Sequence, residues 1–525
     1  MKKYLLISAI VLGIAWDFLF WEKAPGVSFP IFTLACLLAG VLLLRPEGKR
    51  PSAWSLALIV PILFFSLMSF MRRDPLTTFL NFTFTLLLVY ILAATYFSGL
   101  WPSFGIFDYI TRFFLLLGGL FTLPWKLLAE SNGAQDDESR KKRKDLVWQI
   151  LRGLVLAIPL LLLFTCLLSS ADLVFEKRLQ DLVAFLNLET LRELLTRGLL
   201  VLGFAYAFIG LIRHAVLNGD NKKLVGAEKP VVPPFLGFTE NAIILGSVIL
   251  LFIAFVSIQF RYFFSGELNI DVGGFTYSEY ARRGFGELVA VAVISLLLVQ
   301  VLSAILKPAN DKQRSIFTGL TGGLVGLVLV ILVSAFQRLW LYESAYGFTS
   351  LRSYSHVFMI WLGLVLVARV VIEVLGKGRF FINLVLFASL GFGLTLNLMN
   401  VDAFIVRQNV RRTVQGEMLD ASYLASLTTD SVPALVDEFS SGGHTDEVHE
   451  GIGAALACQQ EFLKDDASRP RAWQSFHLPD WRARKQIALV EDQLEAYQII
   501  EEDWTREVKT PGGTIYDCWS DQFFD

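Results

Sequence analysis

The chain has 525 residues, of which 54% are hydrophobic and only 18% are charged, and its mean hydropathy is +0.55. This composition excludes a chain that folds wholly in water, because soluble globular domains are markedly more polar. The formal net charge of −2 conceals a division near residue 400, since the first 400 residues carry a net charge of +10 and the last 125 a net charge of −12. The acidic tail argues against nucleic acid or an anionic lipid surface as its partner.

Twelve apolar stretches are candidate membrane spans, since a helix needs about 20 residues to cross a hydrocarbon layer about 30 Å thick. Residues 1–20 have the lysines and the apolar run of a secretory signal without a convincing cleavage site, and they are interpreted as an uncleaved first span. Residues 241–258 and 316–336 contain no charged residue, whereas a water-soluble helix of that length shows a polar face. The candidates are centred near residues 12, 36, 62, 87, 115, 160, 207, 250, 297, 326, 366 and 390.

The fifth and seventh candidates are the weakest. Asp108, Arg112 and Pro124 interrupt the fifth, which could instead be re-entrant. Arg197 and Arg213 frame the seventh, at positions from which long basic side chains reach the lipid headgroups.

Residues 173–195 repeat apolar side chains at helical spacing, as expected of a helix lying in the interface or of a short connecting helix. The sequence therefore predicts an all-α fold, a polytopic transmembrane helix bundle of about 11–12 spans with a small, mostly helical C-terminal soluble domain. The expected divisions are N-terminal transmembrane helices at 1–128, a charged linker at 129–146, a core transmembrane bundle with polar loops at 147–400 and an acidic helical domain at 401–525.

Basic residues in the connections predict the orientation, because loops that face the cytoplasm are enriched in Lys and Arg. From Lys126 onward, one alternating set of connections holds fifteen basic residues and the other about eight, so the first set is expected to face the cytoplasm. With twelve spans the acidic tail then lies outside, but the basic residues at 2–3 and 45–50 would also face outward. Four spans before Lys126, with a re-entrant fifth candidate, would place every basic cluster inside.

The most polar connections lie at the ends of the later spans. Glu279, Arg283 and Glu287 are four residues apart, so a helix there would carry them as one charged stripe. The stretch "LYESAYGFTSLR", residues 341–352, brings a carboxylate, a guanidinium and two phenols together. Ten side chains form this predicted polar rim: Asp172, Glu279, Arg283, Glu287, Arg338, Tyr342, Glu343, Tyr346, Arg352 and His356. A structural rim of ion pairs and interfacial aromatic residues is favoured over a ligand site, and both interpretations stay open.

Three further features bear on chemistry. Arg369 and Glu373 are four residues apart within the eleventh span, which makes them a functional-site candidate, although an ion pair near the span end would suffice. Cys458 and Cys518 of the tail would form a disulfide if the tail lies outside, and buried free thiols are the alternative. No zinc-peptidase spacing, phosphate-binding glycine loop or nucleophile motif is present, so no catalytic residue, metal site or cofactor is expected.

Several motifs, taken as a set, resemble a family of bacterial multi-spanning membrane proteins catalogued as domain of unknown function forty-one seventy-three. They are "SSADLVF" (169–175), "YSEYARRGFGEL" (277–288), "RLWLYESAYGFTSLR" (338–352), "NVDAFIVRQNVRR" (400–412) and "LDASYLASLTTDSVPALV" (419–436). The resemblance covers roughly residues 145–440. It implies a bacterial envelope setting, favours treating the outer loops and the "NVDAF" junction as one unit, and assigns no activity, ligand or catalytic residue.

The leading hypothesis is a non-enzymatic sensory, regulatory or envelope-scaffold protein of a bacterial inner membrane, with its C-terminal domain outside the cytoplasm. Its expected partners are the lipid bilayer and an envelope protein or small ligand at the polar rim, without nucleic acid. A secondary transporter is the first alternative, based on the span count and on the pair Arg369 and Glu373. A membrane-embedded transferase is the second, with Glu279, Glu343 and Arg352 as conceivable acid, base and anion clamp.

Overall fold

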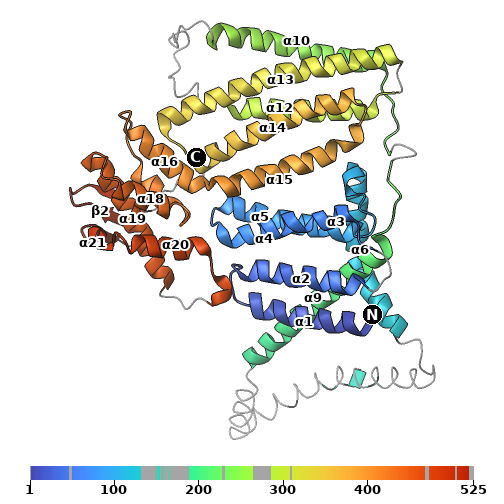
Figure 1. Ribbon diagram of the computed structural model, residues 1–525, viewed down its shortest axis with the longest axis horizontal. Helices are drawn as coiled ribbons and strands as arrows, with labels where there is room; N and C mark the ends of the chain where they lie inside the picture. Colours follow the sequence, from blue (N-terminus) through green and yellow to red (C-terminus); the bar gives the residue numbers. More distant parts are fainter. Residues whose placement is uncertain are drawn as a thin grey trace. The chain divides into compact units, whose positions relative to one another are not determined.

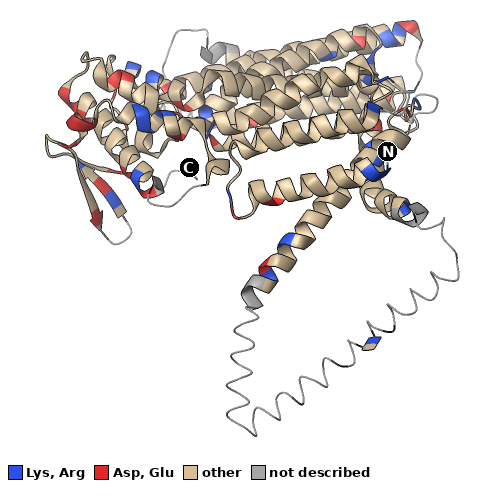
Figure 2. Ribbon diagram, turned by 60° about the horizontal axis from the view of Figure 1, so that its bottom comes forward, with Lys and Arg blue, Asp and Glu red and all other residues tan. Residues whose placement is uncertain are grey.

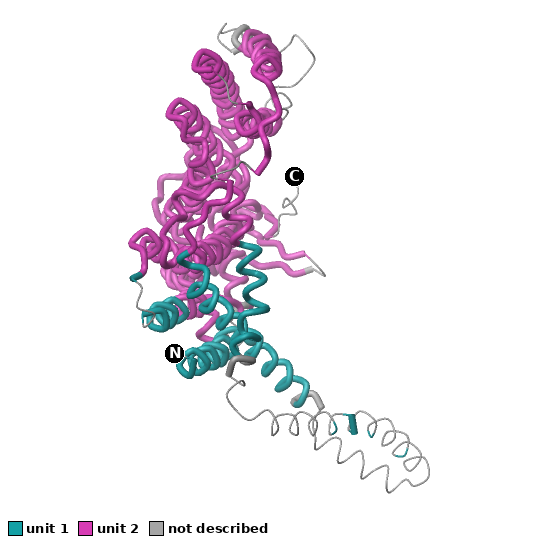
Figure 3. The backbone as a smooth tube through the Cα atoms, turned by 90° about the vertical axis from the view of Figure 1, so that its right-hand side faces the viewer, with its two compact units in different colours: residues 1–23, 34–50, 113–220 teal, residues 24–33, 51–112, 221–525 magenta. Residues whose placement is uncertain are grey.

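The computed structural model describes residues 2–45, 50–131, 188–226, 231–263, 285–307, 310–467, 472–502 and 505–518, with a few isolated helical positions between 149 and 164. The chain divides into two compact units, distinguished by colour in Figure 3. The first unit comprises residues 1–23, 34–50 and 113–220, and the second comprises residues 24–33, 51–112 and 221–525.

Ten helical segments in the described part of the chain are long and apolar enough to cross a membrane. They are α1 (Lys2–Phe20), α3 with α4 (Ala53–Ala57, Ile59–Met71), α5 (Pro75–Thr95), α6 (Ile106–Ser131), α9 (Leu188–Asn218), α10 (Phe238–Phe263), α12 (Phe285–Ile305), α13 (Asp311–Tyr346), α14 (Ser350–Val374) and α15 (Phe381–Met399), which the short η4 (Gly378–Phe380) precedes. The apolar α2 (Ser28–Leu44) has 17 residues, and the candidate span near residue 160 lies outside the described residues. The predicted all-α, multi-pass architecture is confirmed.

Five long helices of the second unit pack side by side (Figure 1). α10 and α12 both pack against α13, α14 lies between α13 and α15, and α15 also contacts α5. Ala292, Leu324 and Leu366 are fully buried between these helices, whereas Leu250 and Val333 remain 69% and 67% exposed. Such large exposed aliphatic side chains on long helices are expected where lipid is the solvent.

The first unit contains α1 packed against α9. Gly13 permits the close approach, because a Cβ atom there would lie 2.5 Å from the carbonyl oxygen of Val201. Near the end of α1, the guanidinium of Arg197 donates to the buried carboxylate of Asp17, with Nη2 2.6 Å from Oδ2. An ion pair accounts for a carboxylate in an otherwise apolar helix.

A set of polar contacts at one end of the second unit, here called the Arg379 end, explains the charges that weaken the fifth candidate span. The fully buried carboxylate of Asp108 pairs with Arg379, with Oδ2 2.6 Å from Nη2, and accepts the backbone N–H of Val225 at 2.6 Å. Arg112 donates to the carbonyl oxygen of Asn221 at 2.8 Å. α6 is one continuous helix that includes Pro124, and its predicted re-entrant placement stays a prediction.

The C-terminal part of the second unit is a small helical domain with a terminal sheet. Its helices are α16 (Val401–Thr413), α17 (Ala421–Ser426), α18 (Val432–Ser440), α19 (Asp446–Ala467), α20 (Leu478–Ile487) and α21 (Glu491–Leu494). The strands β1 (Gln498–Glu502), β2 (Thr505–Lys509) and β3 (Ile515–Asp517) form an antiparallel sheet in that order. Figure 2 shows charged residues gathered in this domain and at helix ends, and sparse along the bundle.

A disulfide stabilises this domain, and its apolar core joins it to the bundle. Cys458 of α19 and Cys518, just after β3, form a disulfide with their Cα atoms 5.5 Å apart. The apolar core of α16 to α20 is continuous with Val357 of α14 and Leu396 of α15, so the domain is packed onto the bundle and not merely tethered to it.

Candidate functional site

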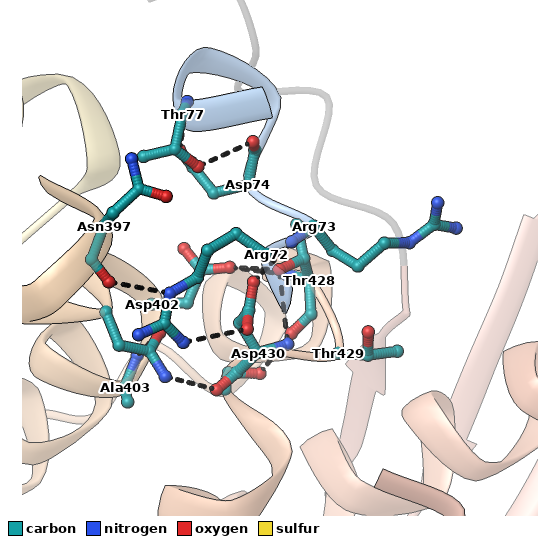
Figure 4. A network of polar contacts seen from close by, with 12 residues as sticks. Arg72, Arg73, Asp74, Thr77, Asn397, Asp402, Ala403, Thr428, Thr429 and Asp430 are labelled. Atoms are coloured by element: carbon teal, nitrogen blue, oxygen red, sulfur yellow. Dashed lines mark hydrogen bonds and ion pairs between the residues drawn. The ribbon is translucent and has the colours of Figure 1, made fainter. Parts of the chain in front are cut away.

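Buried polar side chains meet where the C-terminal domain packs on the bundle, and most of them are drawn in Figure 4. They come from three connections that are distant in the chain, between α4 and α5, between α15 and α16, and between α17 and α18, and from helices α5, α14, α15 and α16 beside them. We call them the junction network, which consists of Arg72, Arg73, Asp74, Asn81, Tyr354, Asn397, Asn400, Asp402, Thr428 and Asp430.

Arg72 and Asp430 form the central ion pair. The Nη1 atom of Arg72 lies 3.4 Å from Oδ1 of Asp430, and its Nε donates to the carbonyl oxygen of Asn397 at 2.8 Å. The other carboxylate oxygen of Asp430 accepts the backbone N–H of Arg73 at 2.6 Å. Burial raises the pKa of Asp430, while the Arg73 N–H and the Arg72 guanidinium act in the opposite direction. Because the Asp430 side chain is only 4% exposed, its charge depends on these partners.

Asp74 connects the first helices to α14. It is the N-cap of α5, with Oδ2 accepting the backbone N–H of Thr77 at 2.8 Å, and Pro75 follows at the first helical position. Its other carboxylate oxygen accepts the phenolic O–H of Tyr354. One carboxylate therefore caps a helix and binds a second helix at once.

Asp402 lies in the first turn of α16, where it accepts from Thr428 twice: the backbone N–H donates to Oδ2 at 3.0 Å and the hydroxyl at 2.5 Å. Burial raises the pKa of Asp402 to about 7, and the negative charge of Asp74 contributes to this rise, against the hydrogen bonds from Thr428. Asp402 is therefore a group whose charge can change near neutral pH.

Amide side chains fix the helices that carry these carboxylates. Asn81 of α5 and Asn397 of α15 exchange two hydrogen bonds, at 3.0 and 2.8 Å, and both are fully buried. Asn400 adopts a left-handed conformation, with φ of +53°, and caps α16 through the N–H of Ala403. Asparagine tolerates this conformation better than most residues. The change of direction from α15 to α16 therefore sits within the network.

The stretch at residues 341–352 forms a second contact with the C-terminal domain. Gly347 has a φ of +84°, and Asn409 of α16 binds the backbone of Phe348 on both sides, at 2.7 Å to N and 2.9 Å to O. Arg412 donates to the carbonyl oxygen of Ser344 at 2.8 Å. Arg352 donates to the carbonyl oxygen of Gly347 at 2.6 Å, and so holds the α13–α14 loop.

The predicted polar rim is divided by the structure. The guanidinium of Arg352 lies 4.2 Å from the Tyr342 ring centre, and the Tyr346 ring is 4.9 Å from that of Tyr342 and 53% exposed. Glu287 is exposed in the first turn of α12. Asp172, Glu279 and Arg283 lie outside the described residues, so their predicted meeting with Arg338, Glu343 and Arg352 stays a prediction.

Within the bundle, Glu343 and His356 face each other across the α13–α14 hairpin, with Oε1 3.3 Å from Nδ1. Arg338, five residues earlier on α13, donates to Oε1 of Gln259 at 2.8 Å. At the other end of α14, Arg369 is fully buried and pairs with Glu373, with Nη1 2.8 Å from Oε2.

Sequence reasoning missed most of the junction network. The sequence predictions assign no role to Arg72, Arg73 or Asp74. Two signals were present: the "NVDAF" motif contains Asn400 and Asp402, and "TTDSVP" contains Thr428 and Asp430. Among the described residues, no group of three or more His, Cys, Asp or Glu side chains is placed to hold a metal ion.

Comparison with known proteins identifies one family. A family model described as a domain of unknown function (DUF4153) matches residues 59–438, a range that includes every member of the junction network. The resemblance to a multi-spanning family of unknown function is thereby confirmed, under the number 4153 in place of forty-one seventy-three. No curated protein and no solved structure matches the chain.

Proposed function

The chain belongs to the family described as a domain of unknown function (DUF4153), and from this premise we propose that it is a sensory or regulatory protein of a bacterial inner membrane. In this proposal the C-terminal domain recognises an envelope component, and the junction network couples its state to the spanning helices α5, α14 and α15.

The observation that carries the proposal is the bonding pattern of the junction network. Asp430 of the C-terminal domain depends on Arg72 and Arg73 of the bundle, and Tyr354 of α14 depends on Asp74. A displacement of the C-terminal domain would leave buried charges without partners, which costs several kcal/mol per group, about 3 to 5 for a broken buried pair. Two discrete arrangements of such a network would be needed for signalling, because coupling requires a bistable element.

The distribution of basic residues supports an outer C-terminal domain. Within the second unit, seven basic residues lie in the described connections and first helical turns at the Arg379 end: Lys222, Lys223, Lys307, Lys312, Arg314, Lys377 and Arg379. At the end that contacts the C-terminal domain, the α4–α5 connection has Arg72 and Arg73, and the first turn of α14 has Arg352.

This asymmetry favours an arrangement with the Arg379 end in the cytoplasm. The disulfide of the C-terminal domain favours the same orientation, because disulfides persist in oxidising compartments.

A secondary transporter is the alternative that one observation favours. Arg369 is fully buried within a candidate span and keeps an ion pair with Glu373, which also accepts from Ser303 of α12 at 3.1 Å. Ionisable groups inside a membrane are often part of a substrate or proton path.

Complementation of a gene deletion in the encoding organism separates the two functions. The transcript profile of the deletion strain is compared with that of strains carrying Asp430→Asn, Arg72→Met, or the matched pair variants Arg369→Met and Glu373→Gln. Each variant is first shown to reach the membrane in wild-type amount with its disulfide intact.

The sensory proposal expects the junction variants to reproduce the profile of the deletion strain and the pair variants to restore the wild-type profile. The opposite result, with loss of function only at Arg369 and Glu373, would replace the proposal with the transporter.

A further inference from the structure

We infer that Glu343 and His356 form a proton-binding site inside the α13–α14 hairpin, in which the buried carboxyl group and the imidazole beside it share a proton. This inference rests on the geometry of the hairpin alone and stands whether or not the sensory proposal is correct.

The first observation is the burial of Glu343 without hydrogen bonds. Glu343 is fully buried in the last turn of α13, and neither carboxylate oxygen has a hydrogen-bond partner among the described residues. An isolated buried carboxylate is costly, and such a group is neutralised by a proton or paired with a cation.

The second observation is the imidazole beside this carboxyl. Nδ1 of His356 lies 3.3 Å from Oε1 of Glu343, and the side chain is 15% exposed. Within the described part of the chain, its other ring nitrogen, Nε2, also has no hydrogen-bond partner, and the hydroxyl of Ser353, one turn earlier on α14, has none either. The ring of Phe336 packs against the imidazole, with its centre 4.4 Å from that of the His356 ring. A low-dielectric wall strengthens the coupling between the two groups.

The surrounding charges are already engaged elsewhere. On α13, Arg338 donates to Gln259 of α10, and Tyr342 lies under the guanidinium of Arg352. Arg352 of α14 is bonded to Gly347, and Tyr354 of the same helix is bonded to Asp74. Tyr346 of α13 lies against Tyr342, and Glu287 of α12 is exposed. Arg412 of α16 is bonded to Ser344, and the oxygen of Tyr423 of α17 accepts from the N–H of Ser350. None of these forms an ion pair with Glu343 within 4.0 Å among the described residues.

Such a pair titrates as one unit. The carboxyl and imidazole hold one proton together, either as carboxylate with imidazolium or as two neutral groups. A second proton leaves the carboxyl neutral beside an imidazolium, which ends their attraction. Protonation therefore changes the interaction that joins the last turn of α13 to α14.

Labelling with dicyclohexylcarbodiimide tests the site in membranes that contain the full chain. A protonated carboxyl adds across one C=N bond: its oxygen bonds to the central carbon, its proton moves to nitrogen, and the acyl group then migrates to give a stable acylurea. Mass spectrometry of the peptides measures the modified fraction of each glutamate. Glu373 is the internal control, because Arg369 and Ser303 hold its carboxylate.

The inference expects labelling of Glu343 to increase as the pH falls from 8 to 5, with Glu373 unlabelled throughout. His356→Phe removes the imidazolium that favours the carboxylate, so the pH of half-labelling should rise by about one unit or more. Two results would overturn the inference: labelling of Glu343 in the unaltered chain that is absent or independent of pH, or an unchanged half-labelling pH in His356→Phe. The first measurement needs no variant, so a folding defect in the second leaves the inference open to refutation.

Discussion

Replacement of Asp402 by asparagine changes the charge at the most strongly perturbed carboxyl of the junction network without changing its size. The pKa of Asp402 is raised from 3.8 to about 7, chiefly by burial. A raised pKa means that the folded chain holds the proton more tightly than the unfolded chain. The carboxyl therefore stabilises the fold fully below its usual pKa of 3.8, and this contribution is lost as the pH rises through about 7.

The size of the effect follows from the pKa change, since one unit corresponds to about 1.4 kcal/mol. A rise of about three units gives up to about 4 kcal/mol between pH 4 and pH 8. The asparagine of the variant would keep the hydrogen bonds from Thr428, because its amide oxygen accepts as the carboxylate does. The Asp402→Asn variant should match the unaltered chain near pH 4 and exceed its free energy of unfolding at pH 8.

Urea titration of the full chain in detergent, monitored by tryptophan fluorescence at pH 4, 6 and 8, measures these differences in the free energy of unfolding. Asp420→Asn is a matched control, because Asp420 is an exposed N-cap of α17 and asparagine caps equally well. Burial also raises the pKa of Asp430, so the Asp402→Asn variant should keep a smaller slope of the same sign. A variant that is less stable at pH 8, or that keeps the full pH dependence, would refute the reasoning.

Three further substitutions test the contacts around the junction. Arg72→Met should lower the free energy of unfolding by about 3 kcal/mol, because it leaves Asp430 buried without its cation, and a loss below about 1 kcal/mol in the same titration would contradict this. Cys458→Ser removes the disulfide that closes a loop of 60 residues, and it should lower the free energy of unfolding by about 4 kcal/mol. Proteolysis of the C-terminal domain should then be faster, and an unchanged rate would argue against the bond. Gly347→Ala should speed hydrogen exchange in the α13–α14 loop, because φ is +84° and the new Cβ would lie 2.9 Å from the Arg412 guanidinium. The strain should lower the stability of the loop by about 1 to 3 kcal/mol. An unaltered exchange rate would contradict this.

The spanning helices could be predicted from sequence because hydropathy over about 20 residues reflects a local requirement, the pairing of backbone groups within the helix. The helical character of the C-terminal domain followed from apolar spacing in the same way.

The junction network could not be predicted, because its members are brought together by tertiary packing. Arg72 and Asp430 are 358 positions apart, and Asn81 and Asn397 are 316 apart. A single sequence shows which side chains share a face of one helix but not which distant faces meet. The same limit applies to Glu343 and His356, which both belong to the predicted polar rim but were not predicted to face each other.

Sidedness is the most direct test of the account, since a sensory C-terminal domain in the envelope must lie opposite the basic loops. Two variants each carry a single free cysteine at an exposed position: Gly443→Cys in the C-terminal domain and Lys377→Cys at the Arg379 end. In both, Cys36 and Cys166 are replaced by serine. The disulfide between Cys458 and Cys518 does not react and is kept. A maleimide that cannot cross the inner membrane should label the first variant in intact spheroplasts and the second only after permeabilisation. Labelling of the second variant in intact spheroplasts, with the first protected, would contradict the account.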